Sequence, residues 1–152
     1  MSAKLDLNGK VAVVTGGGGI LCGCMAKALA ECGAKVAVLD LKLESAEKIA
    51  NEIKEKGGTA IGLSANVLDI ESLRNAEKQI RETFGTCDIL INGAGGNHPK
   101  GTTSAEKLTL SDITNPVEGK VTFFDLDPAG IGFVFNLNFL GTLLPSQVFC
   151  RE

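Results

Sequence analysis

Four consecutive glycines at positions 16–19 constrain the fold of this chain more than any other feature. They follow residues 11–14, a short apolar run rich in β-branched side chains, and precede residues 20–30, where apolar side chains recur at helical spacing. This pattern predicts a strand, a tight turn and a helix in that order. A second apolar run at 35–39 ends in Asp40, about 20 residues beyond the glycines, which is the spacing of a dinucleotide-binding βαβ unit.

Each part of such a unit has a physical role. Glycine adopts backbone angles that other residues avoid, and it lets a pyrophosphate approach the main chain closely. The helix that follows directs unpaired N–H groups and its positive dipole end toward the phosphates. The Asp40 carboxylate can accept hydrogen bonds from both ribose hydroxyls, while its charge would repel a 2′-phosphate. We therefore expect NAD as the cofactor, with NADP less favoured.

The glycine run alone would also fit a turn without special function, because no window satisfies a strict G-x-G-x-x-G. In the windows that begin at Gly16 and Gly17, the last motif position holds Leu21 and Cys22. The preceding strand, the following amphipathic helix and the acid at the right distance together favour nucleotide binding.

Size and charge exclude several classes of protein. A chain of 152 residues with 44% hydrophobic and 22% charged residues has the size and composition of one globular domain. Its net charge of −3 gives no reason to expect nucleic acid as a partner. No apolar run approaches the roughly 20 residues of a membrane span, and the first ten residues lack the apolar core of a signal peptide. We expect a cytoplasmic protein without a membrane partner.

The five cysteines do not suggest a metal site or a disulfide framework. Their number is odd, no C-x-x-C pair occurs, and the single histidine, His98, is distant in sequence. Reduced thiols and no bound metal are therefore expected. Cys22 and Cys24 lie near a predicted helix start, which can lower a thiol pKa. Small side chains that pack this helix against a sheet are the preferred interpretation over a redox role.

Strands and helices continue to alternate beyond Asp40. Helices are expected over 43–56 and over 70–84, the second with Asp69 as its N-cap, and strands over 59–64 and 88–91. This alternation predicts an α/β fold, a three-layer doubly wound parallel sheet of the Rossmann type with helices on both faces.

Polar and glycine-rich segments follow the predicted strands, and in parallel sheets ligands bind outside the carboxyl ends of strands. One extended ligand could therefore touch the glycine turn, Asp40, Asn66 and the segment 92–96. The residues expected to contact the cofactor are Thr15, Gly16, Gly18, Gly19, Ile20, Leu21, Asp40, Leu41, Asn66, Val67, Asn92, Gly93, Ala94 and Gly95.

The same strand ends resemble the short-chain dehydrogenase/reductase family. Thr15-Gly16, Asp40, Asn66-Val67 and the NGAG at 92–95 correspond to the family patterns TGxxxGxG, Asp, Asp-Val and NNAG. The chain departs from these patterns at four positions, where it has Ile20, Cys22, Asn66 and Gly93. The resemblance covers essentially the whole chain, and it implies a nicotinamide-dependent oxidoreductase that forms a homotetramer, partly through a long helix near the carboxyl end.

Three further runs resemble one subgroup of that family, the D-mannonate oxidoreductases or fructuronate reductases. They are DILINGAGGNHP at 88–99, FFDLD at 123–127 and NFLGTLLPSQVF at 138–149. This resemblance implies reduction of D-fructuronate, a small sugar acid, to D-mannonate. Two alternatives stay open, namely a reductase of another sugar acid such as a ketogluconate, and a nucleotide-binding or subunit-interaction module without catalysis.

Residues 96–126, called the arm below, are too many for an ordinary loop between a strand and a helix. The arm begins beside the expected nicotinamide position, so we expect it to line the substrate pocket. Gly96, Asn97 and His98 are the candidates for substrate contact, since His98 could hydrogen-bond a hydroxyl or carboxylate. A solvated loop histidine is the alternative interpretation.

One catalytic residue follows from the family resemblance. Asn138 matches the family's active-site Asn, which organises a proton-relay water; the alternative is an amide that caps neighbouring backbone. Its helix is expected to start at Asp127-Pro128 and to run toward Phe149 with an exposed apolar face. The family's proton donor is a Tyr assisted by Ser and Lys, and this chain contains no Tyr. We therefore expect residues 1–152 to be an incomplete, inactive NAD(P)-binding domain, with the remaining strands and catalytic residues beyond Glu152.

Overall fold

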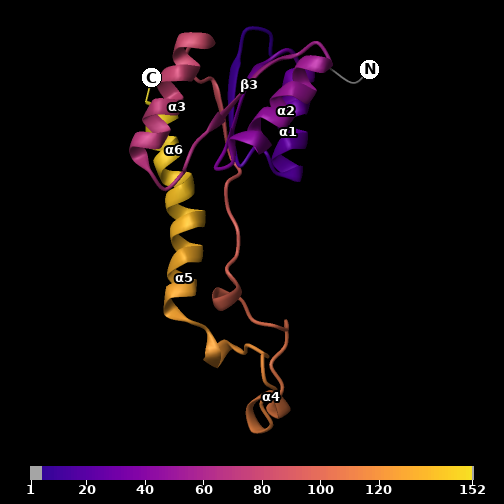
Figure 1. Cartoon of the computed structure of the whole chain (residues 1–152), viewed down its shortest axis with the longest axis vertical. Coiled ribbons are helices and arrows are strands. Elements are labelled where there is room, and N and C mark those ends of the chain that lie inside the picture. Colours follow the sequence, from indigo (N-terminus) through magenta and orange to yellow (C-terminus); the bar gives the residue numbers. More distant parts are fainter. Residues whose placement is uncertain (1–4, 152) are drawn as a thin grey trace.

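Four parallel strands form the centre of the computed structural model, which describes residues 5–151 (Figure 1). The strands are β1 (Val11–Thr15), β2 (Lys35–Asp40), β3 (Thr59–Ser64) and β4 (Ile89–Asn92). They lie in the order β3-β2-β1-β4, with β1 between β2 and β4. The chain thus builds outward from β1 in one direction and then crosses to its other side. This reversal confirms the doubly wound parallel sheet predicted from the alternation.

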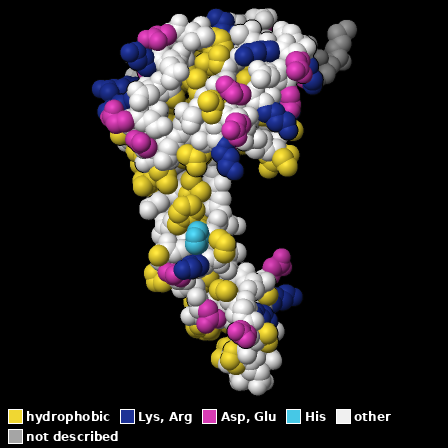
Figure 2. Space-filling view, in the orientation of Figure 1, with side chains coloured by type: hydrophobic (Ala, Val, Ile, Leu, Met, Phe, Trp, Pro, Cys, Tyr) yellow, Lys and Arg dark blue, Asp and Glu magenta, His cyan; other side chains and the backbone are white. Residues whose placement is uncertain are grey.

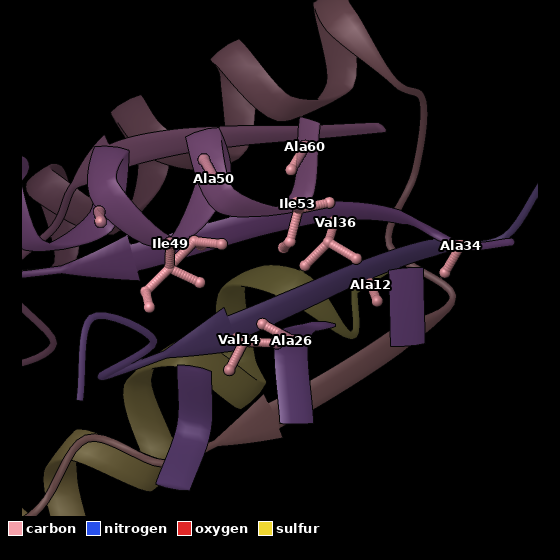
Figure 3. Packing of buried hydrophobic residues seen from close by; sticks show 11 residues of the cluster. Ala12, Val14, Ala26, Ala34, Val36, Ile49, Ala50, Ile53 and Ala60 are labelled. Carbon is pink, nitrogen blue, oxygen red and sulfur yellow. The ribbon is translucent and has the colours of Figure 1, made fainter. Parts of the chain in front are cut away.

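Helices cover both faces of the sheet. The first three are α1 (Ile20–Glu31), α2 (Leu43–Glu55) and α3 (Ile70–Thr83). Alternate side chains of each strand point to opposite faces, so Val14 and Val38 pack with α1 and α2 in one core, which Figure 3 shows from close by. Val13 and Leu39 pack with α3 in the other core. The layers are helix, sheet and helix, as expected.

The ends of these helices have local causes that the sequence displays. Asp69 accepts hydrogen bonds from the backbone N–H groups of Glu71 at 2.9 Å and Ser72 at 3.3 Å, which confirms it as the N-cap of α3. Gly57 and Gly85 follow α2 and α3 with φ of +83° and +107°, a left-handed conformation that stops a helix.

The arm projects away from the sheet and contains three short helices (Figure 1). These are η1 (Pro99–Gly101), α4 (Leu110–Thr114) and η2 (Phe123–Asp125). The backbone N–H of Ser104 donates to the Val121 carbonyl and the N–H of Val121 to the Ser104 hydroxyl, both at 2.9 Å. Near the tip, a hydrogen bond from Lys120 is the main cause that lowers the Asp112 pKa to about 2. The arm is therefore an ordered projection held by its own bonds.

A long helix returns from the arm to the sheet. It consists of α5 (Pro128–Phe135), a π-helical turn η3 (Asn136–Leu140) and α6 (Gly141–Phe149). As expected, Asp127 caps its start by accepting the Ala129 N–H at 2.8 Å. The carboxyl-terminal part packs on α3 and β4 and buries Phe149, whereas α5 and η3 leave the sheet. Figure 2 shows hydrophobic side chains gathered along the part of the molecule that extends from the sheet and at its far end.

This 22-residue helix, Pro128–Phe149, is long and apolar enough to cross a membrane by length and composition, with a mean hydropathy of 1.3 in its best window. This differs from the expectation that no apolar run approaches the length of a membrane span. Asn136, Asn138 and Gln147 divide the helix into shorter runs without making it polar on average. Only 17% of this window is buried, although α6 packs on α3.

Removal of the α3 cap tests this account of the fold. Asp69→Ala should lower the free energy of unfolding by about 1 kcal/mol, because two backbone N–H groups lose their acceptor. Urea unfolding followed by circular dichroism measures the change. Lys78→Ala, on an exposed position of the same helix, should change stability by less than about 0.5 kcal/mol. Equal losses in the two variants would contradict the capping role.

Candidate functional site

A cavity of about 560 Å³ opens where the four strands end. Its lining comes from the glycine turn and the start of α1, from the ends of β2 and β3, from the loop after β4 and from the helical turn η3. The lining residues are Gly16, Gly19, Ile20, Leu21, Cys22, Asp40, Leu41, Ala65, Asn66, Val67, Gly93, Ala94, Gly95 and Leu137. The carboxyl edge of the sheet thus brings together segments that lie up to about 120 residues apart, at a size typical of ligand pockets.

The glycine turn lies directly against the loop that follows β4. Gly16 has φ of +62°, and a Cβ there would come within 2.9 Å of the Ala94 backbone, so both conformation and space require glycine. Gly19 is the N-cap of α1 and provides no side-chain acceptor for the first N–H groups of the helix. These N–H groups therefore provide a binding position for an anion at the edge of the cavity.

The buried Thr15 hydroxyl holds the loop after β4 in place. Its side chain is fully buried, and its hydroxyl accepts hydrogen bonds from the backbone N–H groups of Gly93 at 3.1 Å and Ala94 at 3.2 Å. A single buried oxygen thereby holds two successive peptides of the cavity wall. Thr15 supports the cavity without lining it.

Two polar side chains at the ends of β2 and β3 already bind backbone groups. Asp40 accepts the Gly18 N–H through Oδ2 and the Lys42 N–H through Oδ1, each at 3.1 Å. Asn66 accepts the Leu68 N–H through Oδ1 at 3.0 Å. Both side chains line the cavity, and Gly18 lies behind Asp40 outside the lining.

Cys22 and Gly93 fit each other in size. A Cβ on Gly93 would lie 2.2 Å from the Cys22 sulfur, so the thiol occupies the space that a side chain at 93 would need. Burial, and then the charge of Asp40, raises the pKa of Cys22. The lowered pKa that a helix start could give is therefore wrong for Cys22. Packing against the sheet holds for half-buried Cys22 but is wrong for Cys24, which is exposed.

Asn138 binds the loop after β4 with both ends of its amide. Its Nδ2 donates to the carbonyls of Gly96 and Val134, each at 2.8 Å, and its Oδ1 accepts the Gly96 N–H at 3.2 Å. These bonds are those of an amide that caps neighbouring backbone, which was the alternative interpretation. Its role in a proton relay stays a prediction.

The three candidates for substrate contact lie at the start of the arm, outside the cavity lining. Of these, Gly96 is held by Asn138, and Asn97 is exposed. His98 accepts the Lys100 N–H through Nδ1 at 3.2 Å, and its ring centroid is 5.2 Å from that of Phe133. In neutral His98 this leaves Nε2 as the proton-bearing nitrogen. Between residues 5 and 151, the arm extends beyond the cavity and contributes no lining residue to it, and its predicted place in a substrate pocket stays a prediction.

Sequence analysis did not assign three lining residues, Cys22, Ala65 and Leu137, to the ligand. Ala65 directly precedes Asn66, and its place after β3 was a usable signal. Leu137 comes from the long helix, whose approach to the loop after β4 no local pattern displays. Asn92 lies outside the lining, and its Nδ2 donates to the Ser146 hydroxyl at 3.0 Å, so its contact with a cofactor stays a prediction.

A larger cavity of about 790 Å³ lies elsewhere, between α3 and the end of α6. It is remote from the glycine turn, and Arg74, Cys87 and Cys150 are among its lining residues. Burial is the main cause that raises the Cys87 pKa to about 11. Among the described residues, no group of three His, Cys, Asp or Glu side chains is arranged to hold a metal ion in either place.

Comparison with known proteins gives consistent matches along the chain. The family model for short chain dehydrogenase matches residues 10–152. An uncharacterized oxidoreductase of Haemophilus influenzae is 49% identical over 154 residues, which cover 100% of this chain and 52% of that protein. The uncharacterized oxidoreductase UxuB of Bacillus subtilis is 46% identical over 147 residues, covering 97% and 51%. The chain thus spans about half the length of these relatives.

A crystal structure described as a proposed D-mannonate oxidoreductase from Haemophilus influenzae, with bound NAD, has a TM-score of 0.89 to this chain at 51% identity. The match covers 96% of this chain and 51% of that one. A short-chain type dehydrogenase/reductase from Mycobacterium marinum has a TM-score of 0.78 at 25% identity, covering 97% and 50%.

The Thr15 hydroxyl provides a test of the cavity wall. Thr15→Val keeps the shape of the side chain but leaves the N–H groups of Gly93 and Ala94 without their acceptor, so it should lower the free energy of unfolding by about 1–3 kcal/mol. Thr15→Ser keeps the hydroxyl and should lose less. Urea titrations of both variants measure this, and a larger loss in Thr15→Ser would contradict the role of the hydroxyl.

The raised pKa of Cys87 predicts its reactivity. With a pKa of about 11, roughly one Cys87 thiol in a thousand is ionised at pH 8, so alkylation by iodoacetamide should be slow and should accelerate up to about pH 11. Mass spectrometry of each cysteine-containing peptide measures the rates. Exposed Cys24 provides the internal comparison, and a Cys87 rate at pH 8 equal to that of Cys24 would contradict the prediction.

Proposed function

This chain belongs to the short-chain dehydrogenase/reductase family, and we propose that it forms the nucleotide-binding part of an NAD-dependent oxidoreductase. One observation carries the proposal most directly. The glycine turn, the start of α1 without a side-chain cap and the Asp40 carboxylate line one cavity at the carboxyl edge of the sheet. An anion site next to a carboxylate suits a ligand that joins a pyrophosphate to a ribose.

The residues of the cavity fit NAD part by part. The N–H groups at Ile20 and Leu21 suit the pyrophosphate, whereas the Gly19 N–H already donates to the Gly16 carbonyl at 3.0 Å. Leu41, Asn66 and Val67 suit the adenine, where Asn66 can use Nδ2 because its Oδ1 is engaged. The loop of Gly93, Ala94 and Gly95 would lie along the nicotinamide half. The bound NAD of the Haemophilus influenzae structure supports this choice of cofactor.

A nicotinamide supplies the hydride chemistry in such enzymes, and the protein binds and orients. In the family, a Tyr transfers the accompanying proton, and this chain contains no Tyr. We infer that the 152 residues alone bind nucleotide without turnover and that the whole protein is the active enzyme. Asn138 would contribute to the proton relay, with its side-chain amide held by the carbonyls of Gly96 and Val134.

For the substrate we propose a sugar acid, with D-fructuronate reduced to D-mannonate. The support is the similarity to the proposed D-mannonate oxidoreductase and the placement of Gly96, Asn97 and His98 directly after the cavity wall. The His98 Nε2–H could donate to a substrate carboxylate. A ketogluconate would present the same carboxylate and ketone, so it is the alternative substrate.

A subunit-interaction role is the second candidate, and the exposed side of the long helix favours it. Phe135 and Phe139 lie one turn apart and are 70% and 65% exposed. Such an apolar ridge suits contact with another subunit, in line with a homotetramer. We propose this assembly in the cytoplasm, together with the nucleotide site rather than in its place.

A glycine substitution tests the nucleotide site. Gly16→Ala should weaken NADH binding at least about tenfold, since a Cβ there meets Ala94 and the φ of +62° disfavours any side chain. Gly57→Ala introduces comparable backbone strain at φ +83° outside the cavity and should leave the affinity unchanged. Fluorescence enhancement of NADH measures binding. Equal affinities of Gly16→Ala and the unsubstituted chain would contradict the proposed site.

Turnover distinguishes the two parts of the proposal. A protein with the full length of the relatives should oxidise NADH in the presence of D-fructuronate, measured by the loss of NADH absorbance. The 152-residue chain should bind NADH but show no steady oxidation. Steady turnover by this chain would contradict the requirement for a Tyr, and activity of the longer protein only with a ketogluconate would replace the proposed substrate.

A further inference from the structure

The Asp40 carboxylate lies between the glycine turn and the start of α2. We propose that Asp40 is also a positioning residue that holds the glycine turn in its binding conformation before any nucleotide binds. This inference rests on the proposed nucleotide site. The Asp40 carboxylate would then accept hydrogen bonds both from the ribose hydroxyls and from the backbone of the glycine turn. Removing that charge should weaken binding of NADH and NADPH together, and it should not convert the site to NADPH.

Two hydrogen bonds from backbone N–H groups connect the Asp40 carboxylate to the glycine turn and to α2. The Gly18 N–H donates to Asp40 Oδ2 and the Lys42 N–H donates to Asp40 Oδ1, both at 3.1 Å. Lys42 is the N-cap of α2, so one carboxylate joins the turn after β1 to the residue directly before α2. Hydrogen bonds from N–H groups to an ionised acceptor are roughly twice as strong as those between neutral groups.

The backbone at Gly18 also packs closely against Asp40 and the first turn of α2. A Cβ on Gly18 would lie 2.5 Å from the Ser45 Cβ and 2.8 Å from Asp40 Oδ2. The backbone at Gly18 thus fills the space between the carboxylate and the first turn of α2. The N–H of Gly17 donates to the Leu39 carbonyl at 2.9 Å, which ties the same turn to β2. The conformation of the glycine turn therefore depends on β2 and α2 as well as on its own sequence.

The number of acceptor positions makes both roles compatible. An ionised carboxylate has about four lone-pair positions, and the N–H groups of Gly18 and Lys42 use two of them. Two remain, one on each oxygen, for the two ribose hydroxyls. Asparagine at this position would keep one acceptor oxygen, and alanine would keep none.

The consequence concerns cofactor choice. A small neutral residue at position 40 would remove the repulsion of a 2′-phosphate, which alone would improve NADPH binding. It would also release the turn whose N–H groups face the pyrophosphate, and that pyrophosphate is common to NADH and NADPH. Because the loosened turn affects both ligands, Asp40→Ala should lower both affinities.

The first test needs no nucleotide. Amide hydrogen exchange of the 152-residue chain, followed residue by residue by NMR, should be at least about tenfold faster at Gly18 and Lys42 in Asp40→Ala. Asp40→Asn should give an intermediate rate at these two amides, because it keeps one acceptor. Asp69→Ala is the matched control, since Asp69 also accepts two backbone N–H groups at the same edge of the sheet. It should leave Gly18 exchange unchanged.

The second test uses NADH, NADPH and inorganic pyrophosphate as ligands in titrations of the same variants. Asp40→Ala should weaken all three, including pyrophosphate, which has no ribose, whereas Asp69→Ala should weaken none. Unchanged Gly18 exchange, unchanged pyrophosphate affinity or improved NADPH binding in Asp40→Ala would overturn the proposal. If the unsubstituted chain bound no NADH, the proposed function would fail, while the exchange rates would still decide whether Asp40 holds the turn.

Discussion

The close approach of the first and fourth strand ends is the contact on which the candidate site depends. It requires a buried hydroxyl at Thr15 that binds two peptides of the loop after β4, and a glycine at 16 that leaves room for Ala94. Because β1 lies between β2 and β4, this contact places the glycine turn where the chain reverses its direction of sheet building. That placement brings the glycine turn, the uncapped start of α1 and the Asp40 carboxylate to one cavity.

Much of this arrangement could be predicted because it is local in sequence. Strands β1 and β2 are continuous apolar runs, and helices α2 and α3 have clear periodicity. Asp69, Gly57 and Gly85 mark helix ends by the chemistry of their own side chains or backbone. The strand ends could then be placed at one edge, since parallel strands share a direction. The fold class and most of the cavity lining therefore needed only pattern and topology.

Other features depend on contacts between distant residues. The fit of Cys22 to Gly93 joins positions 71 residues apart, and Leu137 reaches the cavity only because the long helix passes the loop after β4. The arm is irregular in sequence, and its course depends on bonds such as that between Ser104 and Val121. Periodicity carries no information about such pairs, so the sequence does not predict that the arm extends away from the sheet.

The position of β4 also affects how copies of this chain meet one another. Within residues 5–151, β4 is the outermost strand on its side of the sheet, so one row of its backbone N–H and C=O groups has no neighbouring strand. Its apolar side chains Ile89, Leu90 and Ile91 remain partly accessible. Such an edge is a template for another strand. Within the described residues β3 is outermost on the other side, so copies of the chain could pair strand to strand at either edge of the sheet.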